Sequence, residues 1–423
     1  MRTRRVTRCV VLCLLPLVCA ATASGRQKTQ PKTRTLSEQE VVDMMVGTAI
    51  LCTRGGDTYG MIQRVKAAYA DGKRYTMIAL EDVPDDWTAF TMFAVGGGGA
   101  WEYVTRRMDS QGFGRGGRGQ AHVQAGPTSA EVLSEYIGKK FDVTFEAEAG
   151  GATASALTTA ERMHIPIVDG CPSGRCLPEV QMSPFNLNSG ITRAPLAGVT
   201  RYGDVVIIPK LVDDYRSEDL TRAIAVSSGG GFTVAANAVS GKVLKANLIP
   251  GFLSKAIRVG RAAREASESG HDAVQAVVAA GEGFLLFKGT VTKSDTRGEQ
   301  GFGWTDAHLQ GTGAFSGSTY KIFNKNENMV AWRDGKLDAS APDLICPIDP
   351  QTGWAIRSGG IIGAFTVGQE VAIVGFPNHP MWRTPKGIDM MGPRHFGFDE
   401  DYVPIEQLHG AAKEHVERQG SPR

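Results

Sequence analysis

The sequence lacks any large excess of one charge. Its 423 residues include 46 lysines and arginines against 44 aspartates and glutamates, a formal net charge of +2. Proteins that bind nucleic acid or an anionic membrane surface through global electrostatics carry a clear basic excess. The composition therefore gives no reason to expect nucleic acid as a partner.

An apolar run long enough to cross a bilayer is also lacking. The run at residues 9–19 is shorter than the roughly 20 residues that a transmembrane helix needs, so no stable membrane span is expected. Arginines precede this run, and small residues follow it at positions 21–23, the spacing that signal peptidase accepts. Residues 1–23 are therefore predicted to be a signal peptide for the secretory pathway. An organelle presequence is the alternative, because no acidic residue occurs before Glu38.

Cysteine is scarce once this leader is set aside, leaving Cys52, Cys171, Cys176 and Cys346. Scattered cysteines in a chain of this length do not form the disulfide framework of small secreted domains. Cys171 and Cys176 are close enough in sequence to pair locally. Two unrelated small apolar residues are the alternative.

Metal-binding spacings are missing too. His308, His379 and His395 lie in the second half, but no HxH or HExxH pattern occurs. The sequence predicts no cofactor, and a divalent metal stays an open alternative.

The length of the chain predicts two domains. Residues 24–35 form a basic, polar linker, and residues 36–200 are predicted to form an α/β N-terminal domain. Residues 201–410 are predicted to form a C-terminal domain that begins with helices and becomes largely β, with a tail at residues 411–423.

The N-terminal domain is predicted to begin with two helices. Ser37 followed by Glu40 is a capping-box pattern before an apolar helical periodicity. The first helix ends at a bend that contains Gly55 and Gly56, and a second resumes at residues 61–70. Backbone N–H groups at such a bend can bind an anion, and a plain turn between helices is the alternative.

A second glycine cluster, around Gly98, follows the β-rich run at residues 88–95. Glycines at a strand end let the backbone approach a substrate or a neighbouring subunit, and a homo-oligomer is expected. The stretch at residues 110–120 is similar to an arginine–glycine nucleic-acid tail. A surface insertion is the favoured interpretation, and nucleic-acid binding ranks last.

Residues 141–179 carry the main functional pattern. A strand at 141–147, a helix at 153–163 and a short strand at 165–168 predict a parallel βαβ unit. In such units, ligands bind at the carboxyl ends of the strands.

Charged residues fall at those ends. Glu148 follows the first strand, Asp169 follows the second, and Arg175 and Glu179 lie in the next loop. Each of them alone can instead cap a helix or form a structural ion pair. We favour a site for the group, because gathering buried charge is costly without a use.

The second half changes character along its length. Helices are predicted at residues 218–226, 252–266 and 272–280. From residue 284 onward, short strands separated by turn signals predict a largely β region.

Several of these segments resemble the S-methyl thiohydantoin desulfurase family, formerly a bacterial domain of unknown function. The resemblance covers residues 36–408 and is strongest at residues 138–182, 342–353, 381–387 and 392–406. It implies an α/β N-terminal part, a β-rich C-terminal part, and a gene placed beside or fused to hydantoinase and oxoprolinase proteins.

The activity that this resemblance implies is hydrolysis. Water would remove the sulfur substituent from a small thiohydantoin-like ring and give a hydantoin and a thiol. The alternative is a non-catalytic or accessory subunit of a hydantoinase-type or oxoprolinase-type complex.

The sequence departs from the family pattern around the expected site. Residues 53–57 replace an uninterrupted glycine run, Thr153 replaces an asparagine, and residues 169–172 replace a segment that usually holds a second aspartate. The residues expected to contact substrate are Gly55, Gly56, Gly98, Gly150, Gly151 and Thr153.

The expected chemistry needs a base, an acid and a positive field. Glu148 or Asp169 is expected to be the base that activates water. Arg175 and the helix N-terminus after Gly151 are expected to supply the positive field, and Glu179 to orient Arg175.

Overall fold

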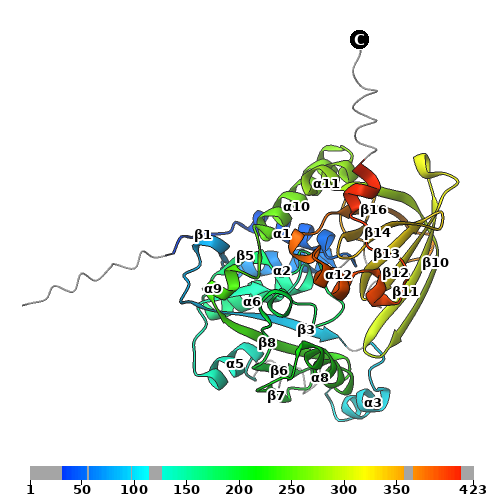
Figure 1. Cartoon of the computed structure of the whole chain (residues 1–423). Coiled ribbons are helices and arrows are strands. Elements are labelled where there is room, and N and C mark those ends of the chain that lie inside the picture. Colours follow the sequence, from blue (N-terminus) through cyan, green and yellow to red (C-terminus); the bar gives the residue numbers. More distant parts are fainter. Residues whose placement is uncertain (1–30, 55–56, 97, 114–125, 357–364, 411–423) are drawn as a thin grey trace, which may run out of the picture. The chain divides into compact units, whose positions relative to one another are not determined.

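A nine-stranded sheet forms the first layer of the protein (Figure 1). The structure is a computed structural model that describes residues 31–54, 57–96, 98–113, 126–356 and 365–410. The strand order is β1-β2-β5-β4-β3-β8-β6-β7, with β9 paired to β5. The strands are β1 (Thr33–Thr35), β2 (Thr76–Ala79), β3 (Thr88–Gly96), β4 (Val143–Glu146), β5 (Ile167–Cys171), β6 (Leu196–Thr200), β7 (Val205–Ile208), β8 (Gly231–Ser240) and β9 (Ile249–Pro250).

The middle of this sheet is parallel, as the sequence predicted. Strands β2 and β5, β5 and β4, and β4 and β3 all pair in parallel, and α6 (Gly151–Met163) connects β4 to β5. The predicted βαβ unit is therefore confirmed. The carboxyl ends of β3 and β4 lie at one edge of the sheet, which brings the residues after each of them close together.

Helices cover the sheet and connect it to the rest of the chain. The predicted capping box is present at the start of α1, where the hydroxyl of Ser37 accepts from the N–H of Glu40. The helices are α1 (Glu38–Leu51), α2 (Thr58–Ala70), α3 (Glu102–Ser110), α5 (Ser129–Ile137), α7 (Pro184–Ser189), α8 (Asp214–Ser227), α9 (Gly241–Lys245), α10 (Phe252–Ser269), α11 (Ala273–Gly281) and α12 (Pro385–Met391), with short 3-10 turns at Leu80–Asp82, Gly313–Phe315, Pro380–Trp382 and Pro393–Phe396.

The second layer is a seven-stranded antiparallel sheet of order β14-β13-β12-β11-β10-β16-β15. The C-terminal region is therefore helical first and then β, as predicted. The strands are β10 (Phe284–Glu299), β11 (Phe302–Gly311), β12 (Thr319–Lys325), β13 (Glu327–Arg333), β14 (Lys336–Ser340), β15 (Leu344–Ile348) and β16 (Glu370–Phe376).

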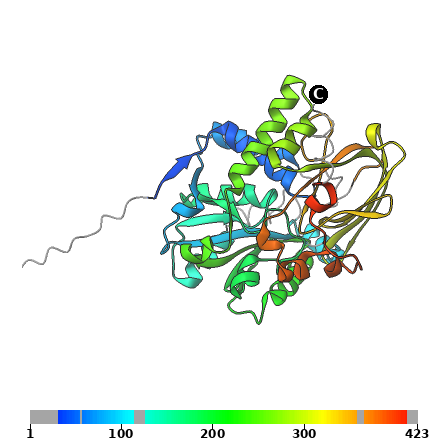
Figure 2. The same cartoon turned by 45° about the horizontal axis from the view of Figure 1, so that its top comes forward.

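Helices α1 and α10 lie between the two sheets and share one apolar core with both (Figure 2). Gly47 of α1 lets the helices meet closely, since a Cβ there would lie 1.8 Å from the carbonyl oxygen of Ala256. Across the same contact, the buried carboxylate of Asp43 accepts from Arg264 at 2.8 Å. This helical layer fixes one sheet against the other.

The chain from Lys32 onward forms one compact unit. Strand β8, which follows residue 200, pairs with β3 and β6 of the first sheet. The domain boundary that the sequence predicts at residue 200 stays a prediction. The leader, residues 114–120 of the arginine–glycine stretch and the tail lie outside the described residues. Among the described helices, none combines the length and apolarity that a bilayer crossing requires.

A disulfide joins Cys52 at the end of α1 to Cys176, 124 residues later in the chain. The suggested local pairing of Cys171 with Cys176 is therefore wrong, because Cys171 is a free, buried thiol. Folding brings the end of α1 against the loop after β5, a proximity that local sequence spacing does not report. The bond is compatible with folding in an oxidising compartment.

Removing this disulfide is expected to destabilise the protein. The double variant Cys52→Ser, Cys176→Ser should lose about 2–5 kcal/mol of unfolding free energy, because the crosslink closes a long loop in the unfolded chain. Urea denaturation monitored by circular dichroism measures this loss. Cys346→Ala, which removes a buried free thiol, is the control and should cost about 1 kcal/mol. Equal stability of the wild type with and without reductant would contradict the expectation.

Candidate active site

A cavity of about 580 Å³ lies where the ends of β3 and β4 meet the tip of the β10–β11 hairpin. Backbone forms much of its wall. At this meeting point the N–H of Gly301 donates to the carbonyl of Gly98 at 2.7 Å, and a Cβ on Gly98 would lie 2.4 Å from the carbonyl oxygen of Phe302. The glycines that line the cavity are Gly96, Gly98, Gly99, Gly151, Gly230, Gly231, Gly298, Gly301 and Gly303.

Glu148 lines this cavity two residues after the end of β4. One of its carboxylate oxygens, Oε2, accepts a hydrogen bond from the backbone N–H of Leu177 at 2.8 Å. Burial raises the pKa of Glu148, and the positive charge of Arg54 and the Leu177 N–H oppose that rise. A glutamate with a raised pKa beside a cavity is suited to exchange protons near neutral pH.

A second carboxyl group, that of Glu327, lines the same cavity. Glu327 is the first residue of β13, and its side chain is 1% exposed. Its Oε1 atom lies 3.2 Å from Nη1 of Arg54. Arg54 thus acts on two cavity carboxyl groups, one following the first sheet's β4 and one from the second sheet. This arrangement lets two acidic side chains occupy one buried space.

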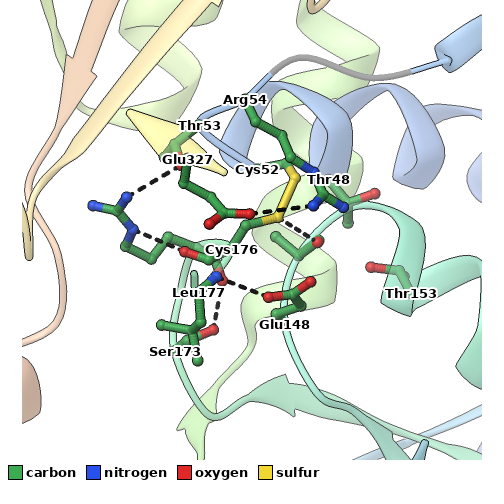
Figure 3. The surroundings of a disulfide bond; sticks show 12 residues. Thr48, Cys52, Thr53, Arg54, Glu148, Thr153, Ser173, Cys176, Leu177 and Glu327 are labelled. Carbon is green, nitrogen blue, oxygen red and sulfur yellow. Dashed lines mark hydrogen bonds and ion pairs between the residues drawn. A yellow bond between two sulfur atoms is a disulfide. The ribbon is translucent and has the colours of Figure 1, made fainter. Parts of the chain in front are cut away.

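The disulfide holds this group together (Figure 3). Cys52 comes two residues before Arg54, and Cys176 comes one residue before Leu177, whose N–H binds Glu148. Gly150 packs against the same bond with a φ of 85°, and a Cβ on it would lie 2.7 Å from the Cys52 sulfur. Only glycine satisfies both the positive φ and the close contact.

The N-terminus of α6 also faces the cavity, through Gly151, Ala152 and Ser155. The N-cap residue Gly150 has no side chain, so no side-chain cap satisfies the first N–H groups of this helix. The N–H groups of a first helical turn and the helix dipole together favour negative charge at this end. The predicted position of Gly151 at a helix N-terminus is therefore confirmed.

Two arginines complete the charged lining. Arg193 donates from Nε to the carbonyl of Val180 at 2.7 Å and from Nη1 to Asn237 at 3.0 Å, and burial lowers its pKa. Arg222 is held by Glu218 at 2.6 Å. It donates to the carbonyls of Gly96, Pro178 and Gly301, and so joins three segments of the cavity wall.

Asp169 has another place in the structure. Strand β5 extends to Cys171, so Asp169 lies within the strand and not after it. Its carboxylate accepts from the N–H of Ser254 at 3.0 Å and from the Ser254 hydroxyl at 2.5 Å. Asp169 therefore caps the start of α10, and it is not among the described residues that line the cavity.

Arg175 is fully buried and does not line the described cavity. Its guanidinium donates to Thr53 at 3.2 Å, and to backbone carbonyls in several segments, at Cys176, Asn328 and Asp343. Burial lowers its pKa to about 10. Its partners make it a structural connection between the two sheets.

Glu179 lines the cavity but does not orient Arg175 in the described structure. It forms an ion pair with Lys325, accepts from Gln181, and lies 2.8 Å from Nε2 of His395. Burial alone would raise its pKa, but the hydrogen bond with His395 and the charge of Lys325 hold it at about 2. Glu179 is therefore a fixed negative charge at neutral pH.

Thr153 lies one layer behind the cavity wall. Its hydroxyl donates to the buried carboxyl group of Glu146, whose pKa is raised to about 8 by burial. Thr153 is not among the residues that line the described cavity. Gly55 and Gly56 lie outside the described residues. The substrate contacts predicted for all of these residues stay predictions.

Sequence reasoning did not single out Arg54, Glu327, Arg193 or Arg222. Arg54 lies in the bend at residues 53–57, where the sequence departs from the family pattern, and this departure could have indicated it as a site residue. Glu327 begins a strand directly after a turn, with nothing local to mark it. No group of three or more histidine, cysteine, aspartate or glutamate side chains able to hold a metal ion occurs within the described parts of the chain.

A protein from Chromobacterium violaceum, solved by X-ray crystallography, is similar in structure with a TM-score of 0.64 and 17% sequence identity. The similarity covers 88% of this chain and 100% of that one, and at this identity it shows a shared fold only. No functionally curated protein matches the sequence.

Two family models match the sequence. The S-Me-THD-like N-terminal domain matches residues 39–210, and the S-Me-THD-like C-terminal domain matches residues 212–405. These matches span most of the chain and follow the resemblance noted in its motifs. The protein therefore belongs to the S-Me-THD-like family, that of the S-methyl thiohydantoin desulfurases.

Proposed function

We propose that this protein hydrolyses an S-methyl thiohydantoin-like ring and releases a hydantoin and a thiol. The observation that carries the proposal is the meeting of Glu148, Arg54 and the α6 N-terminus at one cavity in a chain of this family. The cavity has room for a small five-membered ring, and glycines form part of its wall. A flat ring can lie close to such walls.

In this proposal, Glu148 is the general base. Its carboxylate takes a proton from water, and the water oxygen adds to the ring carbon that carries sulfur. The bond from Leu177 N–H fixes Oε2, and the proposal assigns the water to Oε1, for which the described residues provide no hydrogen bond. Asp169 is not proposed for this role, because Ser254 occupies both of its oxygens.

The positive field in the proposal comes from groups in the cavity wall. Arg193 and the first turn of α6 line the space that the ring would fill. As water adds, negative charge develops on the ring nitrogen and the ring carbonyl. Fixed donors in a buried site stabilise such charge more than bulk water does.

The secretory pathway is the proposed location. The arginine-rich and apolar leader motivates this, and the Cys52–Cys176 disulfide is compatible with it. Edman sequencing of the mature protein tests it, since the proposal expects a new N-terminus near residue 24. An intact Met1 would contradict it.

Glu148→Gln should abolish most turnover of an S-methyl thiohydantoin. The loss should be at least about 100-fold in kcat, because the amide cannot take the proton from water. Thiol release, read with a chromogenic thiol reagent, and chromatography of the hydantoin measure it. Asp169→Asn is the matched control. Its kcat should stay within about tenfold of the wild-type value, because Asp169 is not the base, whereas loss of a general base lowers kcat by more than about tenfold.

Three outcomes of this experiment separate the alternatives. Turnover by Glu148→Gln at the wild-type rate would remove Glu148 as the base. Binding without turnover until a hydantoinase-like or oxoprolinase-like protein is added would support the accessory-subunit function. Neither binding nor turnover by the folded wild type would contradict the proposed substrate class.

The acid limb of the pH profile should depend on Arg54. Because the Arg54 charge opposes the burial that raises the pKa of Glu148, Arg54→Gln should raise that pKa further. The fall in kcat/KM on acidification should then occur at a higher pH than in the wild type. Arg54→Lys retains the charge and should move the limb less. A limb at the same pH in Arg54→Gln would show that Arg54 does not act on the base.

A further inference from the structure

Glu327 is a buried carboxyl group with one oxygen left unbonded. Its Oε1 accepts from Arg54 at 3.2 Å, but Oε2 has no hydrogen-bond partner among the described residues. The side chain is 1% exposed and lines the cavity. An ionised carboxylate with a buried, unbonded oxygen would be costly, so the protonated form of Glu327 is favoured.

The groups around Glu327 favour the protonated form. Burial has the largest effect and raises the pKa of Glu327 to about 8, and the charge of Glu148 acts in the same direction. Arg54, Arg175 and Arg222 oppose this shift without overcoming it. At neutral pH Glu327 therefore carries a proton, while Arg54 keeps the group oriented.

The other acidic side chains near the cavity are unsuited to donate a proton. Glu179 is held ionised by His395 and Lys325. Glu146 lies behind the wall and already accepts from Thr153. Glu148 is the proposed base and must be ionised to take a proton from water. Among the described residues that line the cavity, Glu327 is the carboxyl group that combines a proton with an unbonded oxygen.

We propose that Glu327 is the general acid that protonates the departing sulfur. This role rests on the proposed hydrolase function and completes it. An alkyl thiolate is a basic leaving group, so its departure is faster when a proton reaches the sulfur as the carbon–sulfur bond breaks. An acid on the second sheet and a base following β4 of the first sheet would then act on one ring in the cavity between them.

Every proton that moves in this reaction has a donor and an acceptor. Glu148 takes one proton from water as the carbon–oxygen bond forms and the C=N pair moves to nitrogen, and it then gives that proton to the nitrogen. The carbon–sulfur bond breaks with its electron pair on sulfur, which takes the proton of Glu327. The new hydroxyl gives its proton to Glu148 as C=O forms. Exchange with solvent water then returns Glu148 to the carboxylate and Glu327 to the acid.

The leaving group supplies a specific test. S-methyl and S-(4-nitrophenyl) thiohydantoins share the ring but differ in the basicity of the thiolate, and the aryl thiolate can leave without a proton. In Glu327→Gln, the amide oxygen still accepts from Arg54. This variant should lose at least about 100-fold in kcat on the S-methyl substrate and less than about tenfold on the S-aryl substrate.

Two controls define the comparison. Glu148→Gln should lose activity on both substrates, since both need activated water. Glu102→Gln changes an exposed carboxylate on α3, with 79% of its side chain exposed, and should change neither rate. Hydantoin binding and thermal melting show whether each variant keeps its folded cavity.

A wild-type pH profile makes the test independent of any variant. Turnover of the S-methyl substrate should fall as the pH rises past about 8, where Glu327 loses its proton. The S-aryl substrate should not show this fall. Equal losses on both substrates in folded Glu327→Gln, or the same alkaline limb on both substrates, would overturn the acid role and leave the hydrolase function standing. A wild type that hydrolyses neither substrate would overturn both.

Discussion

The guanidinium of Arg54 is the interaction on which the candidate site depends. It lies against Glu327 and is the strongest charge favouring the ionised form of Glu148. Without a cation beside them, two carboxyl groups in one buried cavity would repel each other and resist ionisation. With Arg54 beside them, the two carboxyl groups can differ in protonation state, so that one is available as a base and the other as an acid. Such a difference between neighbouring carboxyl groups is a common basis for hydrolysis.

The fold supplies the position of that charge. The Cys52–Cys176 disulfide ties the end of α1 to the segment whose N–H binds Glu148, and the α1–α10 layer holds the second sheet against the first. Arg175 adds carbonyl contacts from both sides of this junction. The site is therefore built from several chain segments that are far apart in sequence, and its geometry depends on how the sheets pack.

This explains how much could be predicted from the sequence. Strand and helix periodicity predicted the βαβ unit, and the rule for strand ends located Glu148, because both depend on local order. The prediction for Asp169 failed because β5 continues beyond its apolar residues, so that Asp169 lies within the strand, and because the start of α10 binds its carboxylate. The disulfide and Glu327 could not be predicted, since each depends on tertiary contact between distant segments.

The most direct measurement is a crystal structure of Glu148→Gln soaked with an S-methyl thiohydantoin. Our account predicts that the ring fills the cavity, with the sulfur within hydrogen-bond distance of Glu327 Oε2 and a water between residue 148 and the sulfur-bearing carbon. A ring bound elsewhere, or one whose sulfur points away from Glu327 with no water beside residue 148, would contradict it.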